Sequence, residues 1–221
     1  MKKTRFLMLL ISIVLAIPAM VSAQAARNTK EAVNNERQIK VDKKQVTRDQ
    51  REVREFQSLL TKMDSARAQR AMDTYHRTNG QLRALMYQEL EDARRKAAQS
   101  NVEVGQSHRE RRGERLEAGT AGSAQDYHQP RDDNRDLRDD GRDRHQATAR
   151  HDEMRRLLER AEVIAPGVKS GNRNAMDQCR DLMGSFLIVM HADLAASQAE
   201  LREDGRERNE DRRERRSDYR R

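Results

Sequence analysis

Residues 46–63 read VTRDQREVREFQSLLTKM and contain the apolar repeat that decides the fold. Val46, Val53 and Leu60 recur every seven residues, and Phe56 and Met63 follow the last two by three places. Apolar residues at this spacing line the seam of a coiled coil or of a helical bundle. The stretch therefore predicts a long amphipathic helix that buries one side.

The repeat is imperfect on its N-terminal side. Asp42 and Asp49 stand where the pattern calls for the counterparts of Phe56 and Met63. An acidic residue in a seam weakens apolar packing there. We expect looser pairing near Asp42 and firmer pairing from Val53 onward.

A second apolar helix is predicted near the C-terminus, where residues 182–194 read LMGSFLIVMHADL. Apolar residues recur at helical spacing and form a face suited to a core. This second seam consists of Leu182, Met183, Phe186, Met190 and Leu194. Residues 186–190 are apolar all round the helix, so we expect them to be the most deeply buried segment.

Two further stretches show helical periodicity. Residues 68–98 carry one apolar face, interrupted by Asn79-Gly80, a dipeptide typical of turns. Either a helical hairpin turns there or one long helix is locally weakened, and we favour the break. Residues 147–164 carry another apolar face, and Pro166-Gly167 is expected to end it and to form the turn of a helical hairpin.

The helical pattern fades between residues 101 and 145. This polar stretch contains several glycines and Pro130, which disfavour a continuous helix. It also contains the tandem repeat RDDNRDL-RDDGRDR at residues 131–144. Asp disfavours helix interiors because its side chain competes for backbone donors. We interpret residues 101–145 as a disordered linker. Residues 201–221, rich in Arg and Glu, are expected to form a charged tail, a fraying solvated helix without an apolar face that would dock it.

The N-terminus has the pattern of a secretory signal peptide. Three basic residues precede an apolar run over residues 6–17, and Val21-Ser22-Ala23 offers small residues for cleavage after Ala23. A run of this length is too short to span a bilayer, which argues against an anchor. No Asn-x-Ser/Thr acceptor occurs, so the sequence favours a bacterial periplasmic or secreted protein, without a transmembrane segment in the mature chain.

Composition limits the size of the core. Charged residues make up 37% of the chain and aromatic residues 3%, with no Trp. Removing a signal with three basic and no acidic residues lowers the net charge from +8 to +5. So few large apolar residues suit helices that share a thin seam better than a compact globule. We expect the single Cys179 to be buried rather than to crosslink two chains.

These patterns predict an all-α protein of elongated amphipathic helices, forming a coiled coil or a loose bundle. The expected organisation is a signal peptide (1–23), an N-terminal helical region (24–100), the linker (101–145), a C-terminal helical hairpin (146–200) and the charged tail (201–221).

The motifs of catalysis are missing from the sequence. It has no Gly-x-Ser-x-Gly elbow, no phosphate-binding Gly loop and no His-Glu-x-x-His zinc motif. The pairs Met72/His76 and Met190/His191 could ligate haem or a metal between helices, although Met also fills irregular cores. Residues 132–143 resemble a calcium loop but have Leu137 where Gly is required. We therefore expect no enzyme, no cofactor and no metal.

The leading hypothesis is an exported scaffold, adaptor or chaperone-like protein. It would bind a protein partner, or a second copy of itself, along the two seams. One alternative is an Arg-rich binder of anionic lipid or lipopolysaccharide, since 36 of the 45 basic residues are Arg. The other is a His/Met metal- or haem-binding bundle. Nucleic acid is an unexpected partner because aromatic residues that would stack on bases are scarce.

Overall fold

The computed structural model describes residues 36–37, 39–121 and 129–218, and all but the short turns of these are helical. The first helix covers residues 39–68 and is followed by α2 (Met72–Ala121), α3 (Gln129–Lys169) and α4 (Arg173–Asp218). The four helices pack against one another, and no strand occurs among the described residues, as the all-α prediction requires. The predicted signal peptide lies outside the described residues.

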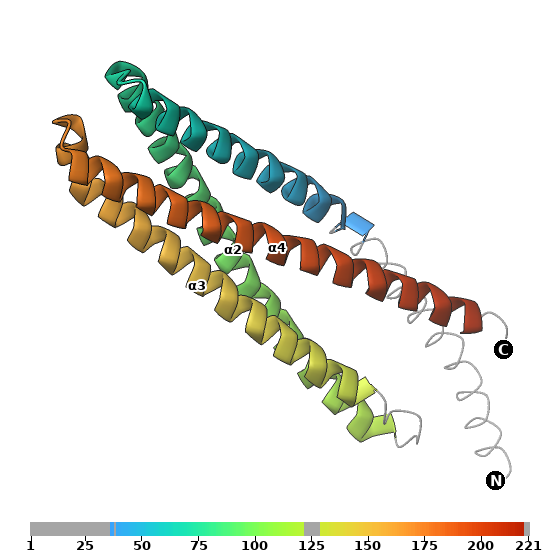
Figure 1. The fold of residues 1–221 in the computed structure, drawn as a ribbon. Helices are drawn as coiled ribbons and strands as arrows, with labels where there is room; N and C mark the ends of the chain where they lie inside the picture. The colour runs from blue at the N-terminus through green and yellow to red at the C-terminus, as the bar shows by residue number, and fades with distance from the viewer. Residues whose placement is uncertain (1–35, 38, 122–128, 219–221) are drawn as a thin grey trace, which may run out of the picture. The chain divides into compact units, whose positions relative to one another are not determined.

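The chain divides into two compact units. One comprises Asp49–Ala195, where four helical segments run alternately in opposite directions (Figure 1). The other comprises residues 1–48 and 196–221. In its described part, Ile39 and Val46 are buried one heptad apart, as the repeat predicts.

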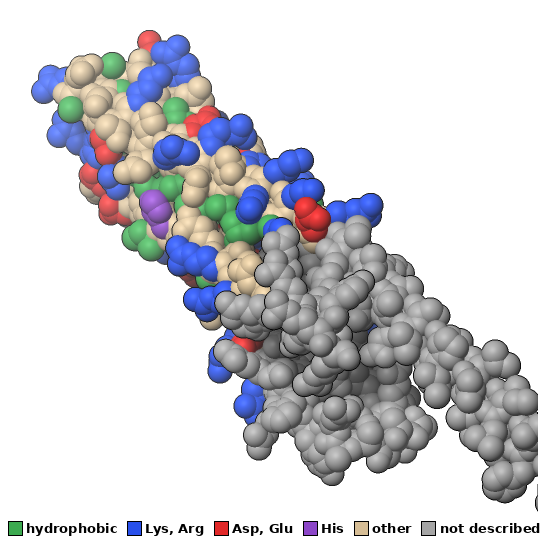
Figure 2. Space-filling model, turned by 90° about the vertical axis from the view of Figure 1, so that its right-hand side faces the viewer, with side chains coloured by type: hydrophobic (Ala, Val, Ile, Leu, Met, Phe, Trp, Pro, Cys, Tyr) green, Lys and Arg blue, Asp and Glu red, His purple; other side chains and the backbone are tan. Residues whose placement is uncertain are grey.

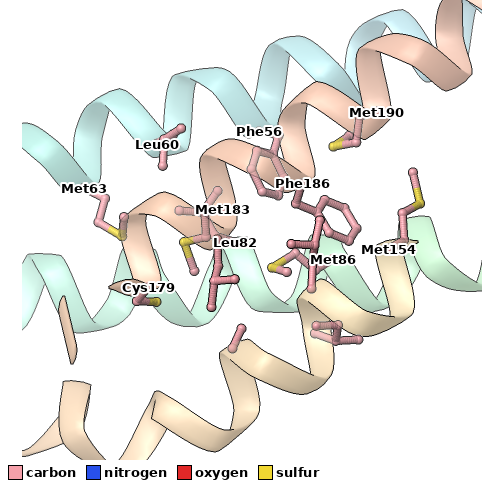
Figure 3. Packing of buried hydrophobic residues seen from close by; sticks show 14 of the residues in the cluster. Phe56, Leu60, Met63, Leu82, Met86, Met154, Cys179, Met183, Phe186 and Met190 are labelled. Atoms are coloured by element: carbon pink, nitrogen blue, oxygen red, sulfur yellow. The ribbon is translucent and has the colours of Figure 1, made fainter. Parts of the chain in front are cut away.

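The core lies in the Asp49–Ala195 unit and draws on all four helices. Phe56, Leu82, Met154 and Phe186, one from each helix, belong to one cluster of buried side chains (Figure 3). Phe56 and Phe186 stack with their ring centroids 5.8 Å apart, which joins the first helix to α4. Methionines fill much of the remaining space, as suits their flexible side chains.

Two turns of the same geometry connect the helices at one end of this unit. After the first helix, Arg70 has a φ of 57°, and the amide of Ala71 donates to the carbonyl of Ala66 (2.8 Å). After α3, Gly171 has a φ of 73°, and the amide of Asn172 donates to Gly167 (3.0 Å). Both are Schellman motifs, which satisfy the last carbonyls of a helix and reverse the chain.

The turn between α3 and α4 lies a few residues later than the sequence predicted. Pro166 is inside α3, which continues to Lys169, and Asn172 caps α4 by accepting a hydrogen bond from the amide of Ala175 (3.2 Å). Gly167 lets α3 and α4 approach closely, because a Cβ atom built there would lie 2.8 Å from Cβ of Ala175. The glycine thus serves helix packing rather than the turn.

The expected break at Asn79-Gly80 is wrong, because α2 runs through both residues. Asn79 is 7% exposed, and its Nδ2 donates to Sγ of Cys179 on α4 (3.1 Å). The side chain therefore bonds across the core instead of supporting a local turn. One glycine costs a helix about 1 kcal/mol, which tertiary packing readily offsets.

Within residues 101–145, where we expected a linker, the described residues are helical, and the disorder expected there stays a prediction. Helix α2 extends to Ala121 and α3 begins at Gln129, so the described residues on both sides of 122–128 are helical. Val104 is buried there, and α2 packs against α3. Arg, Gln and Glu are good helix formers, which compensates for the scattered Asp and Gly. The charged tail, which we expected to be a solvated helix, is helical up to Asp218 as the last part of α4.

Candidate functional site

The structure brings the two predicted seams together in one core. Nine of the ten seam residues are buried. The tenth, Leu194, is partly buried and packs against the core cluster. All of them except Val46 belong to that cluster or pack against it. The nine are Val46, Val53, Phe56, Leu60, Met63, Leu182, Met183, Phe186 and Met190. A seam that is buried within its own chain offers no apolar groove to a partner while the bundle stays folded.

A buried charge network closes the core at the end far from the two turns. It consists of Asp49 on the first helix, Lys96 on α2, Arg150 on α3 and Asp193 on α4. The ammonium of Lys96 donates to Asp49 (2.8 Å) and to Asp193, and Nε of Arg150 donates to Asp193 (2.9 Å). Each helix thus contributes one charged side chain, which fixes their register.

The neighbouring carboxylates favour the charged form of Lys96 despite its burial. Burial alone would lower the pKa of Lys96, but the carboxylates of Asp193 and Asp49 raise that pKa above its ordinary value. Removing one partner would leave the opposite charge buried without compensation, which is costly in a low-dielectric interior. We assign the network a structural role.

An acidic group lies beside the charge network. Glu52 accepts a hydrogen bond from Nε2 of Gln88 (2.7 Å), and Glu89 is 8% exposed with no hydrogen-bond partner at Oε1. Burial, followed by repulsion from Glu52, Asp49 and Asp92, raises the pKa of Glu89 to about 8. No set of three described His, Cys, Asp or Glu side chains has the arrangement of a metal site.

The His and Met pairs considered as metal ligands do not converge. Met190 is 2% exposed, whereas the adjacent His191 is exposed to solvent. Met72 is partly buried against the core, and His76 packs edge-on against Tyr75. Nothing in their placement brings the four side chains to one point. Most side chains of the calcium-like stretch 132–143 lie outside the described residues.

Cross-helix ion pairs use several of the arginines on the bundle surface. Arg180 on α4 pairs with Asp64 of the first helix (3.0 Å). Arg83 on α2 pairs with Glu162 on α3, whose Oε1 also accepts a hydrogen bond from the hydroxyl of Tyr87 (3.0 Å). The hydrogen bond from Arg83 lowers the pKa of Glu162. These arginines therefore connect neighbouring helices, and their guanidinium groups are already paired with carboxylates of the same chain.

The outward side of α4 is unusual for so charged a chain. The stretch from Leu182 to Ala199 contains a single Asp, Glu, Lys or Arg residue, Asp193. The carboxylate of Asp193 belongs to the buried charge network and does not charge the outer side. Ile188 is 70% exposed, which corrects the expectation that residues 186–190 are buried all round. We call the exposed row Ser185, Ile188, Ala192 and Ala195 the α4 stripe.

By length and composition alone, the Arg173–Glu203 part of α4 is apolar enough to cross a membrane. Only 28% of that apolar window is buried in the structure, so much of its apolar surface faces outward. Figure 2 shows one side of the molecule, where a group of hydrophobic side chains lies among Lys and Arg side chains. The burial of Asp193 in ion pairs favours a bundle helix over a membrane span.

Comparison with known proteins adds no assignment. No protein-family model matches the chain, and no curated protein sequence or solved structure is significantly similar to it. The arguments about function therefore depend on this chain's own residues.

Proposed function

We propose that this protein is an exported, non-catalytic helical interaction protein that binds its partner along the α4 stripe. The observation that carries this proposal is the exposure of Ile188, at 70%, within an uncharged stretch of helix. In a chain with 37% charged residues, such a stretch on the surface needs a reason. Exposed apolar patches with a polar surround commonly mark sites of protein association.

The α4 stripe is better suited to this role than the two predicted seams. Residues such as Phe56 and Phe186 are fully buried and stack on each other. A partner that used them would have to open the bundle, at the cost of most of its core. The α4 stripe needs no such rearrangement, since the charge network anchors the inner side of α4 through Asp193.

Photocrosslinking in the producing cell tests this proposal. A photoreactive phenylalanine analogue replaces Ile188 in one variant and Val163, 80% exposed on α3, in a matched control. We expect a defined crosslinked species from position 188 and none from position 163. Equal labelling at both positions, or none at 188, would refute an interaction through the α4 stripe.

Export is tested separately by mass spectrometry of the protein from the periplasmic or culture fraction. Cleavage after Ala23 gives a mature chain that begins at Gln24. A full-length chain that stays in the cytoplasm would contradict this part of the proposal.

The alternative partner is an anionic envelope surface, such as lipopolysaccharide or anionic lipid, contacted by the Arg-rich tail. Such binding would weaken steeply as salt rises, whereas an apolar contact would persist. Vesicle co-sedimentation with and without residues 201–221 separates the two. Binding that is lost with the tail and with salt would favour the alternative.

A further inference from the structure

We propose that the core near the two turns binds one soft monovalent metal ion, Cu(I), between the sulfur atoms of Cys179, Met63 and Met183. The inference goes beyond the proposed function and does not involve the α4 stripe. It follows from the grouping of the sulfur atoms, from a buried hydroxyl donor beside them and from the charge that such an interior tolerates. All the residues concerned belong to the Asp49–Ala195 unit.

Sulfur atoms from two helices meet at one buried amide. Nδ2 of Asn79 on α2 lies 3.1 Å from Sγ of Cys179 on α4 and 4.0 Å from Sδ of Met63 on the first helix. Met183 follows Cys179 by one helical turn on the same face of α4, and Figure 3 shows the three side chains at the same end of the core. None of the three is more than 1% exposed. A small ion at this point can therefore reach a thiol and two thioethers away from water.

The hydroxyl group of Tyr75 is a donor that no group of the described chain accepts. Tyr75 is 1% exposed, and its hydroxyl makes no hydrogen bond within the part of the chain that the structure describes. Burial, and then the neighbouring Cys179, raise the pKa of Tyr75 to about 12, so the hydroxyl keeps its proton. A buried donor without an acceptor is costly. A thiolate at Cys179, formed when a metal binds, would supply the acceptor.

The ligand chemistry selects a soft ion with a single charge. Thiolate and thioether ligands favour Cu(I), whereas Mg²⁺ and Ca²⁺ prefer oxygen. When the metal–sulfur bond forms, the thiol of Cys179 gives its proton to solvent, and the thiolate and Cu(I) together carry no net charge. A neutral pair suits an apolar interior, whereas Zn²⁺ on the same thiolate would leave a buried positive charge. Zn²⁺ also requires four ligands in a structural site.

The groups around the thiol favour its metal-bound form. Burial raises the pKa of Cys179, while the hydrogen bond from Asn79 and the charge of Arg83 lower it. Donors of this kind orient a ligand atom and tune its affinity for a metal. We assign Asn79 and Tyr75 as positioning residues, because their polar atoms lie beside the thiol and would not themselves bind the ion. A cysteine that only fills space in a core needs neither donor.

Metal titration of the folded mature chain tests the site, in reducing buffer without oxygen. Cu(I) is supplied from a chromophoric chelator, and Ag(I) serves as a probe that does not change its oxidation state. We expect one ion per chain and a raised melting temperature, because the ion binds the folded state. Zn²⁺ at the same concentration should not be retained. A folded chain that takes up neither Cu(I) nor Ag(I), or that melts at a lower temperature when loaded, would overturn the proposal.

Ligand variants locate the ion. Cys179→Ser should abolish stoichiometric binding. Met63→Leu and Met183→Leu should each weaken binding about tenfold or more while the helix content stays native, since Leu and Met have similar volumes. Met154→Leu, the matched control on α3, is equally buried at 1% exposure and should bind like the native chain. Native affinity in either Met63→Leu or Met183→Leu would overturn this ligand set.

The variant Tyr75→Phe separates positioning of the thiolate from packing. Without metal it should be at least as stable as the native chain, because the change removes a buried donor that lacks an acceptor. Its affinity for Cu(I) should nevertheless fall about tenfold to a hundredfold. A Tyr75→Phe chain that binds Cu(I) as tightly as the native chain would overturn the role of the hydroxyl, and one that loses stability without metal would show that the hydroxyl has a partner in the protein itself.

Discussion

Replacing Glu89 by Gln is predicted to remove a pH dependence of stability that the native bundle carries near neutrality. The carboxyl group of Glu89 is buried beside Glu52, Asp49 and Asp92, and its pKa is raised from 4.5 to about 8. In the unfolded chain the same group ionises near its ordinary value. Between these two values the folded state holds a proton that the unfolded state has released, so stability falls as the pH rises.

The magnitude follows from linkage. One group that is protonated only in the folded state lowers the free energy of unfolding by about 1.4 kcal/mol for each pH unit. From pH 5.5 to pH 7.5 the native chain should therefore lose about 2–3 kcal/mol. Other shifted groups contribute little there: interactions lower the pKa values of Glu162 and Asp177 and raise that of Lys96, so these groups titrate outside the window.

Urea unfolding followed by helical circular dichroism at both pH values provides the assay. The Glu89→Gln variant has no proton to release at this position, so its stability should exceed that of the native chain at both pH values, and the difference should widen by about 2–3 kcal/mol from pH 5.5 to pH 7.5. Glu159→Gln, at an exposed position on α3, is the control and should leave the native pH dependence in place. A native chain that is more stable at pH 7.5 than at 5.5 would refute the reasoning, as would an unchanged slope in Glu89→Gln.

Three further substitutions test the packing, each through the urea midpoint. Lys96→Met should destabilise the chain by about 3–5 kcal/mol, since Asp49 and Asp193 lose the ammonium between them; a loss below about 1 kcal/mol would count against the charge network. Gly167→Ala should cost about 1–3 kcal/mol by forcing α3 from Ala175, and a neutral effect would show that the helices are farther apart. Arg70→Gly should stabilise by about 1 kcal/mol because it relieves a positive φ; destabilisation would contradict the Schellman turn.

The core could be predicted from the sequence because its signal is periodic. Phe56, Leu60 and Met63 on one helix, and Met183 and Phe186 on another, all lie inside the bundle where their heptad and helical spacing places them. Periodicity reports which side of a helix is buried, and burial of that side is what stabilises it.

The break that was wrongly predicted at Asn79-Gly80 shows where tertiary contacts override local sequence. Asn79 has the local signature of a turn, yet its side chain bonds to Cys179, a hundred residues away. Helix formation through residues 101–121 and 129–145 likewise depends on packing between α2 and α3. Propensities act within a few residues and carry no information about such partners.

The charge network left traces in the sequence that the seam analysis did not use. Asp49 stands in an apolar repeat, Asp193 is the only Asp, Glu, Lys or Arg between Leu182 and Ala199, and Lys96 is the single Lys between Lys62 and Lys169. A charged residue inside an apolar pattern indicates a buried partner. Which partner it is depends on how the helices are arranged around the core, and local sequence does not record that arrangement.

The central claim, that the two seams pack against each other within one chain, is tested most directly by nuclear Overhauser contacts between Phe56 and Phe186. These are the only two Phe residues of the mature chain predicted here, and their ring centroids lie 5.8 Å apart. In a mixture of isotope-labelled and unlabelled chains, an isotope-filtered experiment separates contacts within a chain from contacts between chains. We predict a strong contact within the chain and none between chains. A contact seen only between chains would show that the seams join two copies, and would contradict the single-chain bundle.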